Sequence, residues 1–408
     1  MAPASSSALS GTIASGSGAL GSAAWASDGC EAGAPVGSLE LVLATHTALL
    51  SYNVQTQCWR RISEGRGHYY GVVPVDAASA VGPRSGALLV GSQGKLSRPR
   101  KAAHAAKFAG AAPRNESSGL PGLSDAVLLL NPNARSVIGW WALPTSYLHD
   151  MIFDPESRTL FALDSDAGST LQLSLEMTSQ LGPGNGFLSL PYGAGQVRLH
   201  ARQIYDSVGG RRGIAKLFRG VRAHAAHVNN AAVALGHVWV MHNNLASTSS
   251  IELVDLTTGE KRGGLPLGGP NCHNPCFYRG RLLYLLSSSG GLGRLHPNGT
   301  SETLFAAGKG WFSKGLAVVD HVAYFGLAPK QRSSVERNWA EAQLAAFSLR
   351  TGTMQWRRSL PFRGLINSVT APNVDPSCSW RACDMSSTGA GAAEHLPKEM
   401  EWRRVVNW

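Results

Sequence analysis

One phrase of about twelve residues recurs along this chain and constrains its fold more than any other feature. Each copy has a polar pair, a short apolar stretch, a two-residue turn and a second apolar stretch, and three copies span residues 229–240, 273–284 and 313–324. The hairpins 251–262 and 343–356 turn at a Thr-Gly pair, where glycine supplies the positive φ that such a turn requires. Units of short strands that repeat every 40–50 residues or so are typical of a β-propeller.

Alignment of the copies predicts six inner strands, one for each blade. They begin at six residue pairs: Tyr69-Tyr70, His149-Asp150, Asn229-Asn230, His273-Asn274, Ser313-Lys314 and Ile366-Asn367. The chain before the first pair has strand patterns but no inner strand, whereas residues 368–371 form an inner strand with no hairpin after it. We therefore expect an all-β, six-bladed β-propeller whose ring is closed by N-terminal outer strands pairing with a C-terminal inner strand. Such closure protects the edge strands.

The regions outside the repeat differ from it in composition. Residues 1–38 are rich in Ala, Ser and Gly and predict a disordered tail, residues 39–373 form the propeller, and 374–408 form a C-terminal tail. The N-terminus lacks the basic start and apolar segment of a secretory signal, and no apolar run reaches the roughly 18 residues of a membrane span. Six cysteines without zinc-ribbon spacing are ordinary for a reducing compartment. We expect a cytoplasmic monomer with no transmembrane segment.

The formal charge of +11 is concentrated in two segments, 95–114 and 198–222. Both interrupt the repeat, and we interpret them as basic loops within insertions 94–120 and 186–224. Basic loops can contact nucleic acid, an anionic membrane or an acidic protein, or can simply keep the protein in solution. Aromatic residues are sparse in both segments, which argues against a platform for base stacking.

Residues at equivalent starts of the inner strands should converge at one mouth of the central channel. The predicted ring is Tyr70, Asp150, Asn230, Asn274, Lys314 and Asn367, and the layer before it is Tyr69, His149, Asn229, His273, Ser313 and Ile366. Asn and Asp at such positions are explained either by hydrogen bonds to backbone and water around a channel or by a ligand site.

The blade layout over residues 39–373 resembles six-bladed propellers of the NHL and strictosidine-synthase/gluconolactonase-like groups. The similarity lies in repeat length and blade order, so it implies architecture more than activity. Related lactonases and paraoxonase-like enzymes hold an axial calcium ion. The resemblance therefore implies a possible metal such as calcium, with oxygen ligands from four ring residues, namely Asp150, Asn230, Asn274 and Asn367. This chain departs from that pattern because only one of the four is a carboxylate and Lys314 brings a positive charge.

Two other site chemistries remain open. His149 and His273, with His68 or His227, suit iron or zinc, as in carotenoid oxygenases, although that family has seven blades. Without a metal, Lys314 facing Asp150 would hold an anionic ligand, and a desolvated lysine acts as a base or forms an imine.

We therefore predict a ligand- or protein-binding propeller with a polar channel mouth and basic surface loops, whose ligand is an unidentified small molecule or protein. The alternative is a hydrolase or lactonase-like enzyme in the channel. The candidate catalytic residues are His149, Asp150, His273 and Lys314. The candidate ligand-binding residues are Tyr69, Tyr70, Asn229, Asn230, Asn274 and Asn367.

Overall fold

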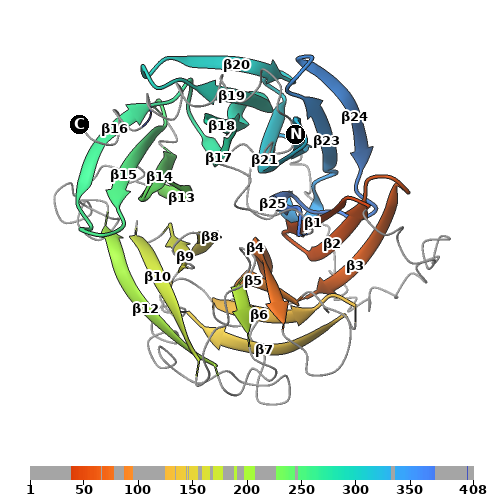
Figure 1. The fold of residues 1–408 in the computed structure, drawn as a ribbon. Helices are drawn as coiled ribbons and strands as arrows, with labels where there is room; N and C mark the ends of the chain where they lie inside the picture. The colour runs from red at the N-terminus through yellow and green to blue at the C-terminus, as the bar shows by residue number, and fades with distance from the viewer. Residues whose placement is uncertain are drawn as a thin grey trace, which may run out of the picture.

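Six sheets stand around a central axis in the computed structural model (Figure 1), which confirms the six-bladed propeller. The structure describes residues 38–65, 67–77, 87–94, 125–133, 135–143, 145, 147–154, 159–165, 169–177, 188–190, 197–206, 227–243, 247–331, 336–372 and 402.

Each blade has four antiparallel strands that run in order from the axis to the rim. In blades 1 to 6, the inner strands are β25 (Ile366–Thr370), β4 (His68–Ala77), β8 (Leu148–Asp154), β13 (His227–Ala234), β17 (Cys272–Tyr278) and β21 (Trp311–Val319). The second strands are β1 (Glu40–Thr45), β5 (Ala87–Gln93), β9 (Thr159–Asp164), β14 (His237–Asn243), β18 (Arg281–Leu286) and β22 (Val322–Pro329). The third strands are β2 (Ala48–Asn53), β6 (Ala126–Asn131), β10 (Ser169–Met177), β15 (Ser250–Asp255), β19 (Gly291–Leu295) and β23 (Gln343–Ser348). The outer strands are β3 (Cys58–Glu64), β7 (Ser136–Ala142), β12 (Val197–Asp206), β16 (Lys261–Pro266), β20 (Ser301–Ala306) and β24 (Thr353–Ser359).

Blade 1 closes the ring with strands from both ends of the propeller sequence. β25 pairs antiparallel with β1, with Val42 opposite Thr370 and Leu43 opposite Val369. Leu43 and Ile366 are fully buried in one apolar cluster that also contains residues of blade 6. The predicted closure is therefore confirmed, and it hides two edges that would otherwise be free to pair.

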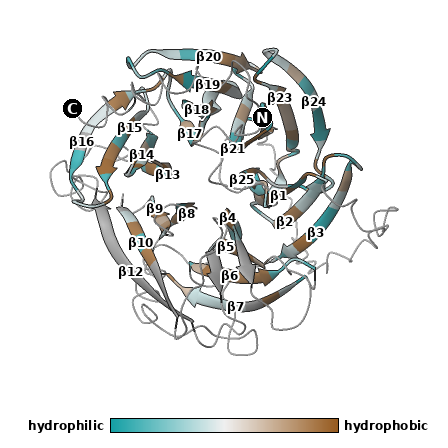
Figure 2. Cartoon of the chain, viewed as in Figure 1, coloured by the Kyte–Doolittle hydropathy of each residue, from teal (hydrophilic) through white to brown (hydrophobic). Residues whose placement is uncertain are grey.

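Burial follows the position of a strand within its blade. All six residues of β2 are buried, whereas β24 is mostly exposed and predominantly hydrophilic (Figure 2). β-branched and large aliphatic residues therefore fill the layers between blades, and polar residues face solvent at the rim. No helix within the described residues is long and apolar enough to cross a membrane.

The structure differs from our expectations outside the regular repeat. Part of the second basic segment is not a loop, because β12 supplies the outer strand of blade 3 by pairing with β10. A short strand, β11 (Leu188–Leu190), pairs parallel with β4 in blade 2. The basic segment 95–114 and residues 207–222 lie outside the described residues.

Trp402 shows that the segment expected as a C-terminal tail reaches the propeller. Its fully buried indole packs edge-on against Trp239 and Phe277, with ring centroids 5.3 and 6.0 Å away. Its Nε1 donates a hydrogen bond to the carbonyl oxygen of Gly280 (3.0 Å). Trp402 thus packs against blades 4 and 5.

The cysteines also differ from expectation. Cys58 is disulfide-bonded, whereas Cys272 and Cys276 carry free thiols. Burial raises the pKa of both thiols to about 12, so neither is a reactive thiolate at neutral pH.

Candidate functional site

A β-bulge at or next to the predicted ring position interrupts the pairing of all six inner strands. The pairing shifts between Tyr70 and Val72, Leu148 and Asp150, Val228 and Asn230, His273 and Cys276, and Lys314 and Leu316, and opposite β25 it shifts between Ala44 and Thr45. A bulge bends its strand and re-aims side chains. The same local irregularity therefore presents one residue of each blade to the axis.

Gly71 shows why this bend constrains the sequence. It has φ +58°, and a Cβ atom there would lie 2.4 Å from the backbone nitrogen of Met151 in the next blade. Glycine is the residue that combines positive φ with so close an approach.

Three predicted ring residues and the backbone of Gly315 form a belt of hydrogen bonds that crosses three blade boundaries. Asn230 Nδ2 donates to Asp150 Oδ2 (2.6 Å), and Asn230 Oδ1 accepts from the Asn274 backbone nitrogen (3.1 Å). Asn274 Oδ1 then accepts from the backbone nitrogen of Gly315 (2.7 Å). These side chains tie blades 3 to 6 together, which supports a structural role for the Asn residues.

Asn367 and Asn229 differ from the belt residues because they have buried polar atoms without hydrogen-bond partners in the described chain. Asn367 Nδ2 donates to the carbonyl oxygen of Tyr69 (2.8 Å) across the boundary of blades 1 and 2, while its Oδ1 has no hydrogen-bond partner in the described chain. The side chain of Asn229 is fully buried, and its two polar atoms also lack partners there. Buried polar atoms without partners are uncommon in folded proteins and require an explanation.

Beside the belt, five blades contribute one histidine each, and the sixth contributes a lysine. In blade order these residues are His46, His68, His149, His227, His273 and Lys314. The rings of His46 and His68 stack with centroids 4.3 Å apart, and His149 lies 5.4 Å from His227 and 6.0 Å from His273. Tyr70 joins the two groups, at 6.2 Å from His46 and 5.2 Å from His149. We call these six residues with Tyr70 the axial cluster.

Sequence reasoning missed His46 because it lies in the turn between β1 and β2, not on an inner strand. The turn faces the axis since blade 1 takes its inner strand from the C-terminus, and His46 N donates to the carbonyl oxygen of Leu365 just before β25 (3.0 Å). The only available signal was a His in the turn between the second and third strands of the closing blade.

Hydrogen bonds to carbonyl oxygens determine the tautomers of two histidines. His149 Nδ1 lies 2.9 Å from the carbonyl oxygen of Asn229, and His273 Nδ1 lies 3.0 Å from that of Asn271. A carbonyl oxygen only accepts, so each Nδ1 carries a proton and each neutral ring has its lone pair on Nε2. His149 Nε2 therefore accepts a hydrogen bond from Lys314 Nζ at 3.4 Å.

Lys314 is the most unusual member of the cluster. Its side chain is 1% exposed, and its amine lies 4.8 Å from the ring centroid of Tyr70. It has no ion-pair partner in the part of the chain that the structure describes. Burial lowers the pKa of the amine well below its usual value, and the charge of Arg337 lowers it further.

Burial also shifts the neighbouring groups toward their neutral forms. It lowers the pKa values of His46, His149 and His273 well below the ordinary value, and the charge of Lys314 adds to this effect. It raises the pKa of Asp150 to about 6, against the opposing hydrogen bond from Asn230. The cluster therefore contains bases with available lone pairs near neutral pH.

A short segment of blade 6 brings further polar groups to the cluster. It contains the 3-10 helix η5 (Glu336–Trp339), where Asn338 Oδ1 lies 3.2 Å from His46 Nδ1. Arg337 precedes Asn338 in η5, and its charge lowers the pKa values of His46, His273 and Lys314. Trp339 beside it is 58% exposed.

The donors at the predicted metal site do not fit calcium. The Asp150 oxygens accept from Met151 N and Asn230 Nδ2, and the side-chain oxygens of Asn230 and Asn274 accept from backbone N–H groups. Histidine ligation fits no better, because His149 is bonded at both ring nitrogens. No group of three or more His, Cys, Asp or Glu residues in the described chain is arranged to hold a metal. We derive no chemistry through a metal.

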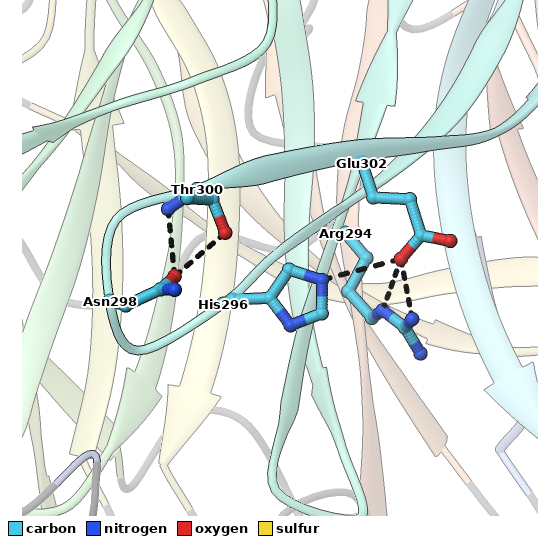
Figure 3. A network of polar contacts seen from close by, with 5 residues as sticks. All are labelled: Arg294, His296, Asn298, Thr300 and Glu302. Carbon is cyan, nitrogen blue, oxygen red and sulfur yellow. Dashed lines mark hydrogen bonds and ion pairs between the residues drawn. The ribbon is translucent and has the colours of Figure 1, made fainter.

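A separate cavity of about 310 Å³ lies at the other end of β17, between blades 5 and 6. Its charged side includes Arg294, whose Nε and Nη2 lie 3.1 and 2.5 Å from Glu302 Oε2, with His296 Nε2 at 3.3 Å (Figure 3). This arginine is paired with a half-exposed carboxylate, and Arg279 and Arg281 also line the cavity, so its wall has more basic than acidic side chains. The ring residues take no part in this cavity.

Comparison with known proteins adds little about activity. No protein-family model matches this chain, and no curated protein matches it. A chain in the crystal structure of a nidogen/laminin complex gives a TM-score of 0.49 at 11% identity, covering 81% of this chain and 97% of that chain. A protein from Lactobacillus plantarum gives 0.44 at 8% identity, covering 81% and 98%. We draw no functional argument from either likeness.

Proposed function

We propose that the protein binds a small anionic molecule at the axial cluster, through Lys314 and Arg337. The observation that carries the proposal is the buried amine of Lys314, which lacks an ion-pair partner in the described chain. A buried cationic group is costly unless it is paired or loses its proton. A bound anion would supply the missing partner.

The balance of charge at the cluster supports this proposal. The guanidinium of Arg337 and the amine of Lys314, which a bound anion would keep protonated, are near one carboxylate, Asp150. That carboxylate is already bonded to Met151 N and Asn230 Nδ2. His46 Nε2 is also buried without a partner among the described residues. Because His46 Nδ1 donates to Asn338 Oδ1, this Nε2 carries a lone pair and would accept a hydrogen bond from a ligand. A negatively charged ligand would offset the excess positive charge.

The hydrolase alternative has weaker support. Ser287 is the hydroxyl in contact with His273, at 2.7 Å from Nδ1. It donates its own proton to the carbonyl oxygen of Ser313 (2.5 Å), so His273 does not activate it as a nucleophile. Protein binding through the basic segments stays a prediction, because most of those residues lie outside the described chain.

Thermal unfolding with added sulfate at constant ionic strength tests the anion site. A ligand that binds only the folded state stabilises it by about 2.7 kcal/mol at a concentration 100-fold above Kd. We expect sulfate to raise the Tm of the wild type, and Lys314→Met and Arg337→Gln to lose most of that increase. Lys330→Met is the matched control, since Lys330 is exposed.

Sulfate also stabilises proteins without binding to a specific site, so specific binding is judged from the difference in the Tm increase between the wild type and the variants. Equal increases in Tm for the wild type, Lys314→Met and Arg337→Gln would refute the site. Binding should also strengthen as pH falls, because an anion raises the pKa values of Lys314 and the histidines and so couples binding to proton uptake.

A further inference from the structure

We propose that Lys314 Nζ forms an imine with the carbonyl carbon of a bound 2-oxo carboxylate. This inference rests on the anion site proposed above and adds to it a reactive group and a substrate class. It is carried by three contacts of one side chain: the burial of Lys314, its hydrogen bond to His149 Nε2 (3.4 Å) and its position on the ring of Tyr70 (4.8 Å).

Attack on a carbonyl requires an amine with a free lone pair. An exposed lysine is almost entirely protonated at neutral pH, whereas burial and a neighbouring positive charge favour the neutral amine. Lys314 has both, because it is enclosed by the blades and lies near Arg337. No carboxylate of the described chain forms an ion pair with it, although the charge of Asp150 partly opposes the lowering of its pKa.

His149 is placed to move the protons of the reaction. The carbonyl oxygen of Asn229 accepts its Nδ1 proton, so Nε2 presents a lone pair to the Lys314 amine. When the amine nitrogen bonds to the carbonyl carbon, the carbonyl π electrons move to oxygen. The nitrogen gives a proton to His149 Nε2, and the alkoxide takes up a proton to become a hydroxyl.

The second half of the reaction restores His149. It returns its proton to the hydroxyl group of the carbinolamine, the C–O bond breaks and water leaves. The nitrogen lone pair then forms the C=N bond, and the remaining N–H proton is released to solvent. The sum is one amine and one carbonyl converted to one imine and one water, with no oxidant or reductant.

A 2-oxo carboxylate fits because one small molecule carries both the anion and the carbonyl, one bond apart. The guanidinium of Arg337 suits a carboxylate, for which it offers a bidentate fork. Lys314 would then face the adjacent carbon.

Reductive trapping tests the inference. The full-length wild type is incubated at pH 7 with glyoxylate or pyruvate and sodium cyanoborohydride, which delivers hydride to an imine carbon and leaves a stable secondary amine. Intact-mass and peptide mass spectrometry then locate the adduct. We expect one rapid adduct at Lys314, with the exposed residues Lys309 and Lys330 labelled at least tenfold more slowly.

Three variants sharpen the test. Lys314→Arg keeps a positive charge for anion binding but cannot form an imine, so it should lose the adduct. His149→Gln should slow trapping at Lys314, because it removes the base, while the protein still shows a Tm increase with sulfate. Lys330→Met should trap like the wild type.

The outcomes separate the two proposals. If Lys314 is labelled no faster than the exposed lysines, the imine proposal is wrong. If the same protein still shows a Tm increase with sulfate, the anion site remains supported. Loss of both the adduct and the sulfate response overturns both. The wild-type labelling ratio is decisive even if a variant fails to fold.

Discussion

Replacement of Lys314 by methionine should stabilise the protein at neutral pH. Methionine keeps an unbranched side chain of similar length against Tyr70 but removes the buried amine. In the unfolded chain this lysine is protonated below about pH 10.5, whereas burial lowers its pKa in the folded protein. Between these two pKa values the unfolded state binds one more proton, so wild-type stability rises with pH by about 1.4 kcal/mol per unit.

The substitution also has a cost. Without the amine, His149 Nε2 loses its donor at 3.4 Å, and an unsatisfied buried acceptor costs about 1–3 kcal/mol. At pH 7 the variant no longer has the cost of burying the amine, and this gain should exceed the cost of the unsatisfied His149 Nε2. Lys314→Met should therefore be more stable than the wild type by ~1–3 kcal/mol. Near pH 10.5 the advantage disappears, so the variant should then be less stable than the wild type.

Urea unfolding followed by tryptophan fluorescence between pH 7 and pH 10 measures this difference. Lys330→Met serves as the control and should stay within about 0.5 kcal/mol of the wild type, as expected at an exposed position. A Lys314→Met variant that is destabilised by the same amount at every pH would refute the reasoning, since it would mean that the folded protein holds this amine charged at no cost.

Two further predictions concern packing and the belt. Trp402→Ala should destabilise the protein by about 3–5 kcal/mol, because it empties a fully buried site and removes the hydrogen bond to Gly280. Calorimetry measures this loss, and the control Trp339→Ala, which removes an exposed indole, should leave the Tm nearly unchanged. Asn230→Ala should cost about 2–4 kcal/mol in urea unfolding, because it removes a donor from Asp150 and an acceptor from a backbone N–H. A cost below about 0.5 kcal/mol for either substitution would show that these contacts contribute little to stability.

The repeat in the sequence was sufficient to predict the architecture. Alternation of apolar and polar residues is a local property of each strand, so the starts of the inner strands at Tyr69, His149 and His273 could be located without any tertiary information. The closing role of β25 followed as well, because it is a lone inner strand at the C-terminal end of the repeat, and N-terminal strands lacked an inner partner.

Other parts of the site depended on contacts between segments far apart in sequence. The ring register brought Asp150, Asn230 and Asn274 together as expected, but their hydrogen bonds leave no oxygen set for the calcium ion that the resemblance implied. β12 was hidden because its charged sequence resembles a loop, and only pairing with β10 makes it a strand.

The sequence alone determined that the chain forms six blades and which residues hold equivalent positions on the inner strands, because strand periodicity is encoded within a few neighbouring residues. Only the tertiary structure decided what those residues meet. His46 comes from a turn and Arg337 from η5, and neither obeys the repeat. The burial of Lys314 arises from ring closure itself, since burial and the field of distant charges exist only once all six blades surround the axis.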